Sequence, residues 1–304
     1  MNRKRSNSND ASASGGDLFA APAAAAPADP LAGNPGVKPV DGIRSGIGGW
    51  TFVPWRDNFY PKGLVQRREL EYASRQLSSI EINGTFYSAQ KPATYAKWAA
   101  DTPEHFVFSL KAPQRVTQFG ALAKAGGGAK AFIDGGLAEF GARLGPILWQ
   151  LAPSRPFDRD DLARFLDSLP RELDGRKLKH VLEVRHPSFL SPDYLELARA
   201  HRVPTVFTDS DEYPSLADIT GDFVYARLMR ARAEIPTGYP QEELDTWARR
   251  VRAWARGEDN PELPHAGEPL APAAPRDVYV YFISAAKERN PAASMRLLQM
   301  LGAR

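Results

Sequence analysis

The fold is indicated by one stretch of the sequence, Ser79-Ile80-Glu81-Ile82-Asn83-Gly84-Thr85-Phe86-Tyr87. Successive side chains of an extended strand point to opposite faces, so Glu81 and Asn83 share the face opposite to the isoleucines. A carboxylate and an amide inside an apolar strand are costly to bury unless they are paired or used. The stretch therefore predicts a buried strand that carries polar groups toward a site and ends in an aromatic turn.

Short apolar runs of this kind recur along the chain, separated by helix-length segments, an alternation typical of parallel α/β sheets. We predict strands at Ile43–Ile47, Ser79–Asn83, Phe106–Lys111, Pro146–Leu151, Val181–Arg185, Val203–Phe207, Phe223–Leu228 and Val278–Ile283. This number and spacing favour an α/β fold of the (β/α)8, TIM-like barrel type over a doubly wound sheet. A dinucleotide-binding fold would also need a phosphate turn, and Gly46-Ile47-Gly48-Gly49 runs into Trp50 without opening a helix.

Apolar residues at helical spacing indicate the helices that cover the sheet. The predicted core-facing stripes are Ile133, Leu137, Phe140 and Leu144; Leu162, Phe165, Leu166 and Leu169; and Leu244, Trp247, Ala248, Val251 and Trp254. The connection after Phe207 lacks such a stripe, so we expect an abbreviated sixth helix. We interpret Gly126-Gly127-Gly128 as a flexible loop and residues 257–277, rich in Pro and Gly, as a long surface loop.

Composition places the chain among soluble globular proteins and excludes several kinds of site. The 39 Lys and Arg against 36 Asp and Glu leave a formal net charge of +3, which does not indicate a broad nucleic-acid or membrane-binding surface. The absence of cysteine excludes disulfides, thiolate metal sites and a cysteine nucleophile. No apolar run has the length that a membrane span needs.

Residues 1–41 are interpreted as a disordered tail rich in Ala, Pro and Ser, and residues 42–304 as a single barrel domain. The basic start Met1-Asn2-Arg3-Lys4-Arg5 is followed by polar residues, and prolines interrupt the later alanine run. We therefore do not expect a cleaved signal peptide, and we expect a cytoplasmic location without membrane association.

Charged side chains occupy alternate positions toward the carboxyl ends of the predicted strands, where barrel active sites are built. The set with the same parity comprises Glu81, Lys111, Glu183, Arg185 and Arg227. We expect these five side chains to share one cavity at the barrel mouth. Gln150 and Asp209, at the ends of the fourth and sixth strands, could join them, although Trp149 competes with Gln150 for the inward position.

Other residues near the strand ends complete the predicted site. They are Asn83, Tyr87, Trp50 and His186. Aromatic rings at a polar mouth can stack on sugars or bases, although such rings often only close a loop over the core. His186 alone among five histidines lies at a strand end, which leaves no multi-histidine zinc site.

The same cluster has a structural alternative. Two glutamates and three cations nearly balance, so they could form an ion network that fills the barrel. Glu81, Glu183 and Asp209 could offer oxygen ligands to magnesium or manganese, but the nearby cations would compete with the metal. We therefore expect no metal and no cofactor.

Several motifs carry a resemblance to a known family. They are Gly49-Trp50 with Trp55, the stretch from Glu81 to Tyr87, Phe108-Ser109-Leu110-Lys111-Ala112-Pro113, Leu144-Gly145-Pro146 with Gln150-Leu151 and Pro153, Glu183-Val184-Arg185-His186-Pro187, and Asp222-Phe223-Val224-Tyr225-Ala226-Arg227. From about Ile43 to Leu301 the chain resembles the YecE-like family, domain of unknown function 72. The resemblance implies a TIM-like barrel and no established activity. Many relatives read like Phe-Asn-Asn after the last strand, where this chain has Phe282-Ile283-Ser284.

We expect an enzyme of hydrolase or lyase type that acts on a small anionic or polyhydroxylated molecule at this mouth. The catalytic candidates are Glu183 as general acid or base, Glu81 as a second carboxylate, and Lys111. The substrate-binding candidates are Arg185, Arg227, Asn83, Tyr87, Trp50, Gln150, His186 and Asp209. Nucleic-acid binding or processing and a non-catalytic small-ligand sensor are the alternatives. A retaining glycosidase is not supported, because the fourth and seventh strands end in Gln150 and Arg227 instead of carboxylates.

Overall fold

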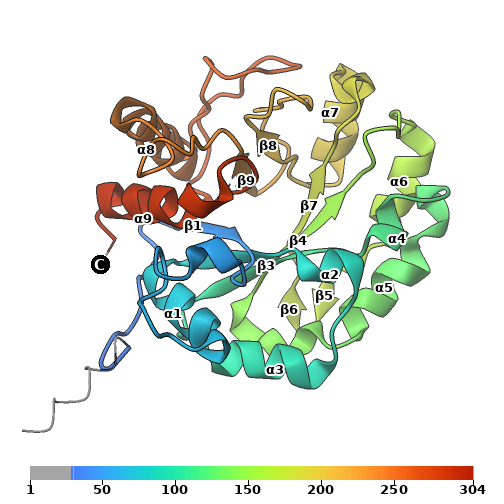
Figure 1. The fold of residues 1–304 in the computed structure, drawn as a ribbon. Coiled ribbons are helices and arrows are strands. Elements are labelled where there is room, and N and C mark those ends of the chain that lie inside the picture. Colours follow the sequence, from blue (N-terminus) through green and yellow to red (C-terminus); the bar gives the residue numbers. More distant parts are fainter. Residues whose placement is uncertain (1–28, 30, 304) are drawn as a thin grey trace, which may run out of the picture.

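Eight parallel strands form a nearly closed barrel in the computed structural model of the protein, which describes residue 29 and residues 31–303 (Figure 1). The strands are β1 Ile43–Gly48, β2 Ser79–Ile82, β3 Val107–Lys111, β4 Leu144–Gln150, β7 His180–Glu183, β8 Phe207–Thr208, β9 Phe223–Leu228 and β10 Asp277–Phe282. Their order is β7-β4-β3-β2-β1-β10-β9-β8, and a parallel bridge between Leu182 and Thr205 joins the two ends. The predicted TIM-like barrel is confirmed.

The helices lie outside the ring of strands (Figure 1). They are α1 Glu69–Gln76, α2 Gly84–Tyr87, α3 Pro92–Ala100, α4 Gln114–Thr117, α5 Gly126–Asp134, α6 Arg159–Ser168, α7 Pro192–Ala200, α8 Gln241–Ala255 and α9 Asn290–Leu301. Short 3-10 turns cover Val53–Trp55, Gln66–Arg68, Leu122–Lys124, Leu137–Arg143, Pro187–Phe189 and Lys287–Arg289, and β5 Glu172–Leu173 pairs with β6 Arg176–Lys177 in a separate hairpin. The apolar stripes predicted for α6 and α8 are buried, and residues 209–222 form no helix, as an abbreviated sixth helix requires.

The sixth strand is shorter than predicted. Its ladder covers only Phe207–Thr208, whereas the sequence indicated Val203–Phe207. Pro204 has no N–H to donate, and this segment meets β7 through two hydrogen bonds, Leu182 N to Pro204 O at 2.9 Å and Val206 N to Leu182 O at 2.9 Å. The barrel is therefore joined least extensively between β7 and β8.

Two local predictions are wrong. Gly126-Gly127-Gly128 forms the first turn of α5 instead of a flexible loop. A Cβ on Gly126 would lie 2.6 Å from Ser168 Oγ, so close packing against α6 accounts for this glycine. The stripe from Ile133 to Leu144 is divided, because Gly136 with φ of 125° separates α5 from the next 3-10 turn and Leu144 begins β4.

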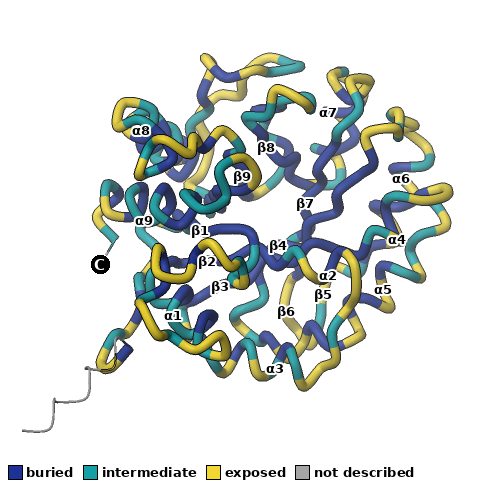
Figure 2. The backbone as a smooth tube through the Cα atoms, in the orientation of Figure 1, coloured by how far each residue is buried: buried dark blue, intermediate teal, exposed yellow. Residues whose placement is uncertain are grey.

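Strand side chains alternate between the helices and the barrel interior, as predicted. The eight barrel strands are buried along most of their length, and exposed residues concentrate in the loops (Figure 2). Ile80 and Ile82 belong to the core cluster that includes residues of the covering helices. Val107, Leu148, Val181 and four aromatic residues, Phe223, Tyr225, Tyr279 and Tyr281, belong to the interior cluster. This packing leaves polar strand-end residues to meet at the mouth.

Two peripheral segments are the long connection before β10 and the N-terminal tail. Residues 256–276 connect α8 to β10 without a helix or strand, which confirms the predicted loop. Most of the predicted disordered tail, with the basic start, lies outside the described residues. In the described part of that tail, Leu31 is buried and Asp29 forms an ion pair with Arg68. None of the described helices is long and apolar enough to cross a membrane.

Candidate functional site

A cavity of about 630 Å³ opens at the carboxyl ends of the strands. We call it the mouth cavity. Its polar lining comprises Asn83, Tyr87, Lys111, Gln114, Gln118, Gln150, Arg185, Arg227, Ser284, Lys287 and Asn290. These residues come from the ends of strands and from the loops after them, which is where the barrel fold places functional groups.

Arg227, at the end of β9, is the centre of a buried ion network. Its Nε and Nη2 donate to Glu81 at 3.1 and 3.0 Å, and its Nη1 donates to Glu183 Oε2 at 2.6 Å. Both carboxylates are fully buried, and Arg227 is 4% exposed. Burial opposes the charge of Arg227, but Glu183 and Glu81 outweigh this effect and raise its pKa above the ordinary value. The guanidinium group therefore stays charged and fixes both glutamates.

Both carboxylate oxygens of Glu183 accept further hydrogen bonds. Gln150 Nε2 donates to its Oε2 at 2.8 Å, and Arg185 Nε donates to its Oε1 at 2.9 Å. Burial alone would raise the pKa of Glu183, but Arg227 and Arg185 lower it to about 2. Its carboxylate is thus ionised at neutral pH, faces these donors and does not line the mouth cavity. Such a group cannot give up a proton near neutral pH.

Glu81 is held in the same way from the other side of the network. Besides Arg227, it accepts the Tyr225 hydroxyl at 2.6 Å, and Tyr225 in turn is hydrogen-bonded to Ser109 at 2.9 Å. The structure therefore brings together the five predicted residues, but in two layers. The glutamates lie behind the cations, and the cations line the cavity.

Lys111 does not join the ion network. Its Nζ lies 3.7 Å from the centre of the Phe86 ring, and none of the carboxylates in the described chain forms an ion pair with it. The side chain is 9% exposed, and Thr85 Oγ1 donates to the Lys111 carbonyl at 2.7 Å, which holds its backbone. Burial and the positive charge of Arg227 lower the pKa of Lys111 to about 8.

The chain after β10 adds two residues that were not predicted, Lys287 in a 3-10 turn and Asn290 at the start of α9. Lys287 Nζ lies over the rings of Phe52 and Trp55, 4.6 and 5.4 Å from their centres. Asn290 is buried, and its Oδ1 has no hydrogen-bond partner among the described residues. The only signal in the sequence was their position after the eighth predicted strand. With Lys287, four cations face two carboxylates at this mouth.

The remaining predicted residues divide between the cavity and other places. Asn83, Tyr87 and Gln150 line the cavity, and Tyr87 is 75% exposed at its edge. Gln150 takes the inward position, because Trp149 packs outward against Phe165 of α6.

Trp50 and His186 are not among the residues that line the cavity. Trp50 packs edge-on against Trp98, with ring centres 4.8 Å apart. His186 accepts a hydrogen bond from the backbone N–H of Ser188 at 3.2 Å, at the start of a 3-10 turn.

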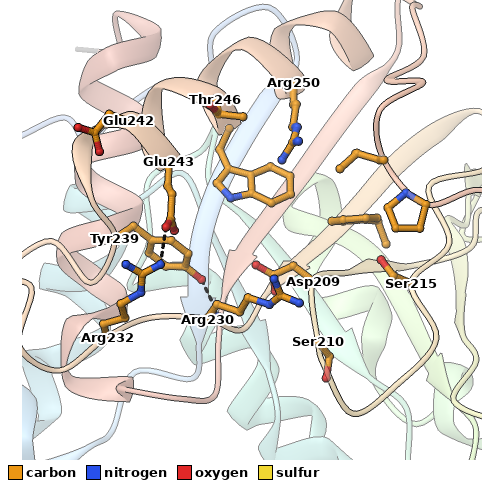
Figure 3. Close-up of a pocket in the computed structure, with 14 residues that line it drawn as sticks. Asp209, Ser210, Ser215, Arg230, Arg232, Tyr239, Glu242, Glu243, Thr246 and Arg250 are labelled. Carbon is orange, nitrogen blue, oxygen red and sulfur yellow. Dashed lines mark hydrogen bonds and ion pairs between the residues drawn. The ribbon is translucent and has the colours of Figure 1, made fainter.

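Asp209 lies in a separate cavity of about 510 Å³ (Figure 3). Burial raises the pKa of Asp209 to about 6, and its Oδ1 accepts the backbone N–H of Met229. The arginines of this second cavity are compensated: Arg230 pairs with Asp211, Arg232 with Glu243 and Arg250 with Glu262. The arginines of the second cavity thus have carboxylate partners, whereas Lys111 and Lys287 of the mouth cavity have none among the described residues.

In the described part of the chain, no group of three or more His, Cys, Asp or Glu side chains is placed to hold a metal ion. Glu81 and Glu183 are directed at Arg227, and Asp209 belongs to the second cavity.

Residues 44–304 match the family model described as "Protein of unknown function DUF72". The chain belongs to the DUF72 family. A DUF72 protein of Thermotoga maritima has the same fold, with a TM-score of 0.65 and 22% identity, over 86% of this chain and 99% of that one. A DUF72 protein of Enterococcus faecalis gives a TM-score of 0.58 and 15% identity, over 85% of this chain and 94% of that one.

A curated relative is similar over a shorter segment. The UPF0759 protein YunF of Bacillus subtilis is 32% identical over 75 residues, which are 25% of this chain and 26% of YunF. The match thus spans about a quarter of that relative. The solved DUF72 structures support the barrel architecture alone.

Proposed function

We propose that this DUF72 protein is an enzyme of hydrolase or lyase type. Its substrate is a small anionic molecule, which can carry several hydroxyl groups, and binds in the mouth cavity. The observation that supports it most is the charge of the cavity. Lys111, Arg185, Arg227 and Lys287 line it, whereas the two glutamates of the site are buried behind the arginines. A substrate carboxylate or phosphate would compensate the remaining positive charge.

The roles of the residues follow from their partners. Arg185 and Arg227 are oriented by Glu183 and Glu81, so they would present fixed donors to an anion. The amides of Asn83, Gln150 and Asn290 would bind hydroxyl or carbonyl groups of the substrate. Lys111, with a pKa of about 8, is better suited than Glu183 to transfer a proton near neutral pH. We therefore assign the glutamates to positioning the arginines.

Thermal unfolding tests the anion site. We expect inorganic phosphate, or a sugar phosphate, to raise the Tm of the native protein, because a ligand that binds only the folded state stabilises it by about 2.7 kcal/mol at 100 times its Kd. Lys111→Met and Lys287→Met should lose this shift. Lys179→Met, at the other end of the barrel, is the matched control and should keep it. Equal shifts in all four proteins would contradict the anion site.

The same screen distinguishes the rival functions. It includes metabolites, nucleotides and short oligonucleotides, and each compound that stabilises the protein is followed by NMR during incubation. Conversion of the compound supports an enzyme, whereas binding without conversion supports a ligand sensor. Stabilisation by oligonucleotides alone, with strong salt dependence, would favour nucleic-acid binding instead.

A further inference from the structure

Lys111 lacks the carboxylate partner that several other described lysines have. Lys97, Lys130 and Lys177 form ion pairs with surface carboxylates, and Lys179 pairs with Asp277. Lys111 has no such partner in the described structure although it lines the mouth cavity together with Arg185 and Arg227. Because Arg227 and Arg185 occupy both glutamates, no carboxylate of the network is left to hold a proton on this amine.

The surroundings of Lys111 also keep its amine usable. The side chain is 9% exposed, and it lines the mouth cavity together with Arg185 and Arg227. The aromatic ring of Phe86 contacts the amine nitrogen, which lies 3.7 Å from the ring centre. A substrate whose anionic group is bound by the arginines would therefore have its adjoining carbon atoms near an amine.

We propose that Lys111 is a nucleophile that forms an imine with the carbonyl carbon of a small anionic aldehyde or ketone. This inference rests on the anion site of the proposed function and narrows it to carbonyl compounds and to lyase-type chemistry. It makes Lys111 a covalent catalyst, a role that burial of the amine and a neighbouring cation favour.

The step balances without an oxidant or reductant. The nitrogen lone pair of neutral Lys111 forms a bond to the carbonyl carbon, the C=O π electrons move to oxygen, and a proton passes from nitrogen to oxygen. The resulting carbinolamine takes up a proton and loses one water to give a protonated imine. This cation can accept the electron pair of an adjacent C–C or C–H bond as that bond breaks, so that carbon dioxide, an aldehyde or a proton leaves and an enamine remains. A proton added to the enamine carbon restores the protonated imine, and addition of water then releases the amine and a carbonyl product.

The protonation state of Lys111 is consistent with this chemistry. With a pKa of about 8, the neutral amine is available near neutral pH. At pH 7 about a tenth of such a group is neutral, against fewer than about one in a thousand for an ordinary lysine. Arg185 and Arg227 stay charged under the same conditions and can bind the anion.

Reductive trapping tests the proposal on the full-length protein. The protein is incubated at pH 7 with glyoxylate, a small anionic aldehyde, and sodium cyanoborohydride, and labelled lysines are identified by peptide mass mapping. We expect Lys111 to be labelled at least about 10-fold faster than the exposed Lys97 and Lys130. Propanal, which lacks the charge, should label Lys111 more slowly, and inorganic phosphate should protect Lys111 from glyoxylate.

Variants keep the test interpretable. Lys111→Arg should remove the fast label while its Tm remains near that of the native protein, and Lys179→Met should label as the native protein does. Labelling of Lys111 no faster than that of Lys97 would overturn the proposal; if phosphate still stabilised the protein, the anion site would stand without it. Fast labelling of Lys111 that phosphate does not slow would contradict the proposal that the substrate is anionic.

Discussion

Two lysines of the barrel, Lys111 at the mouth and Lys179 at the base, have opposite surroundings. Lys179 Nζ donates to Asp277 at 2.6 Å and to the Tyr279 hydroxyl at 2.9 Å. Burial opposes its charge, but Tyr279 and Asp277 outweigh burial and raise its pKa above the ordinary value. At the mouth, burial and Arg227 lower the pKa of Lys111 to about 8. At the base Lys179 has a carboxylate partner, whereas at the mouth Lys111 and Lys287 have none among the described residues.

The largest effect should come from removing the centre of the mouth network. Arg227→Ala leaves Glu81 and Glu183 buried without their shared partner, so we expect the free energy of unfolding to fall by about 3–5 kcal/mol. Arg44→Ala at the base is the control, because the polar contacts of Arg44 are long, 3.5 Å to Asp277 and 3.4 Å to the Gly42 carbonyl, and their loss should cost less than about 1 kcal/mol. Urea unfolding measures both. Similar losses would show that the two ends are stabilised alike.

The next effect concerns acid. The pKa of Glu183 falls to about 2 on folding, so its ionised form stabilises the protein above the ordinary pKa of 4.5, and this contribution is lost as the pH drops from 4.5 toward 2. The shift corresponds to about 3 kcal/mol. Urea unfolding between pH 7 and 3 should therefore show a shallower pH dependence in Glu183→Gln than in the native protein. A pH dependence in Glu183→Gln equal to that of the native protein would contradict the low pKa of Glu183. Glu139→Gln, at an exposed position, is the control and should keep the native pH dependence.

A third comparison exchanges each lysine for an apolar residue of similar length. Because unfolding raises the pKa of Lys111, its charge destabilises the ligand-free protein below pH 8, and stability should rise as the pH goes from 8 to 10.5. Lys111→Met should therefore raise the free energy of unfolding at pH 7 by about 1–3 kcal/mol. Lys179→Met should lower it by about 0.2–1 kcal/mol, since it breaks a partly exposed ion pair. If both substitutions changed the free energy of unfolding in the same direction, the two lysines would not have opposite surroundings.

The smallest expected effect concerns the backbone. At the mouth, Ser284 and Ala285 adopt positive φ values of 58° and 41°, whereas the base places Gly42 at a φ of 77°. Asparagine tolerates this conformation better than serine, so Ser284→Asn should stabilise the protein by about 0.5 kcal/mol. Gly42→Ala should destabilise it by about 1 kcal/mol, because its Cβ would also lie 3.0 Å from Asp277 Oδ1. Differential scanning calorimetry resolves both signs.

The barrel and its inward-facing residues were predictable because strand alternation is a local property of the sequence. The period of two places Glu81, Glu183 and Arg227 on the inner face whatever the neighbouring strands do. The same rule does not say that one arginine takes both glutamates. That outcome depends on distances across the barrel. Arg227 is separated along the chain by 44 positions from Glu183 and by 146 positions from Glu81.

The residues that the sequence did not reveal lie in the segments that follow the strands. Lys287 and Asn290 follow β10 and have no periodic pattern to mark them. Asp209 was expected at the mouth because it follows the sixth strand, but β8 has only two residues and Asp209 joins a different cavity. Chain direction after a short strand is set by tertiary packing, which local spacing does not encode.

The junction between β7 and β8 has a consequence for the motions of the barrel. Its two backbone hydrogen bonds replace the longer ladders found between the other neighbouring strands, so amide protons there should exchange with solvent earlier than those of β1 or β10. Arg227 of β9 reaches across this junction to Glu183 of β7. An anion that reinforces the arginine would thus slow exchange at a place that it does not touch.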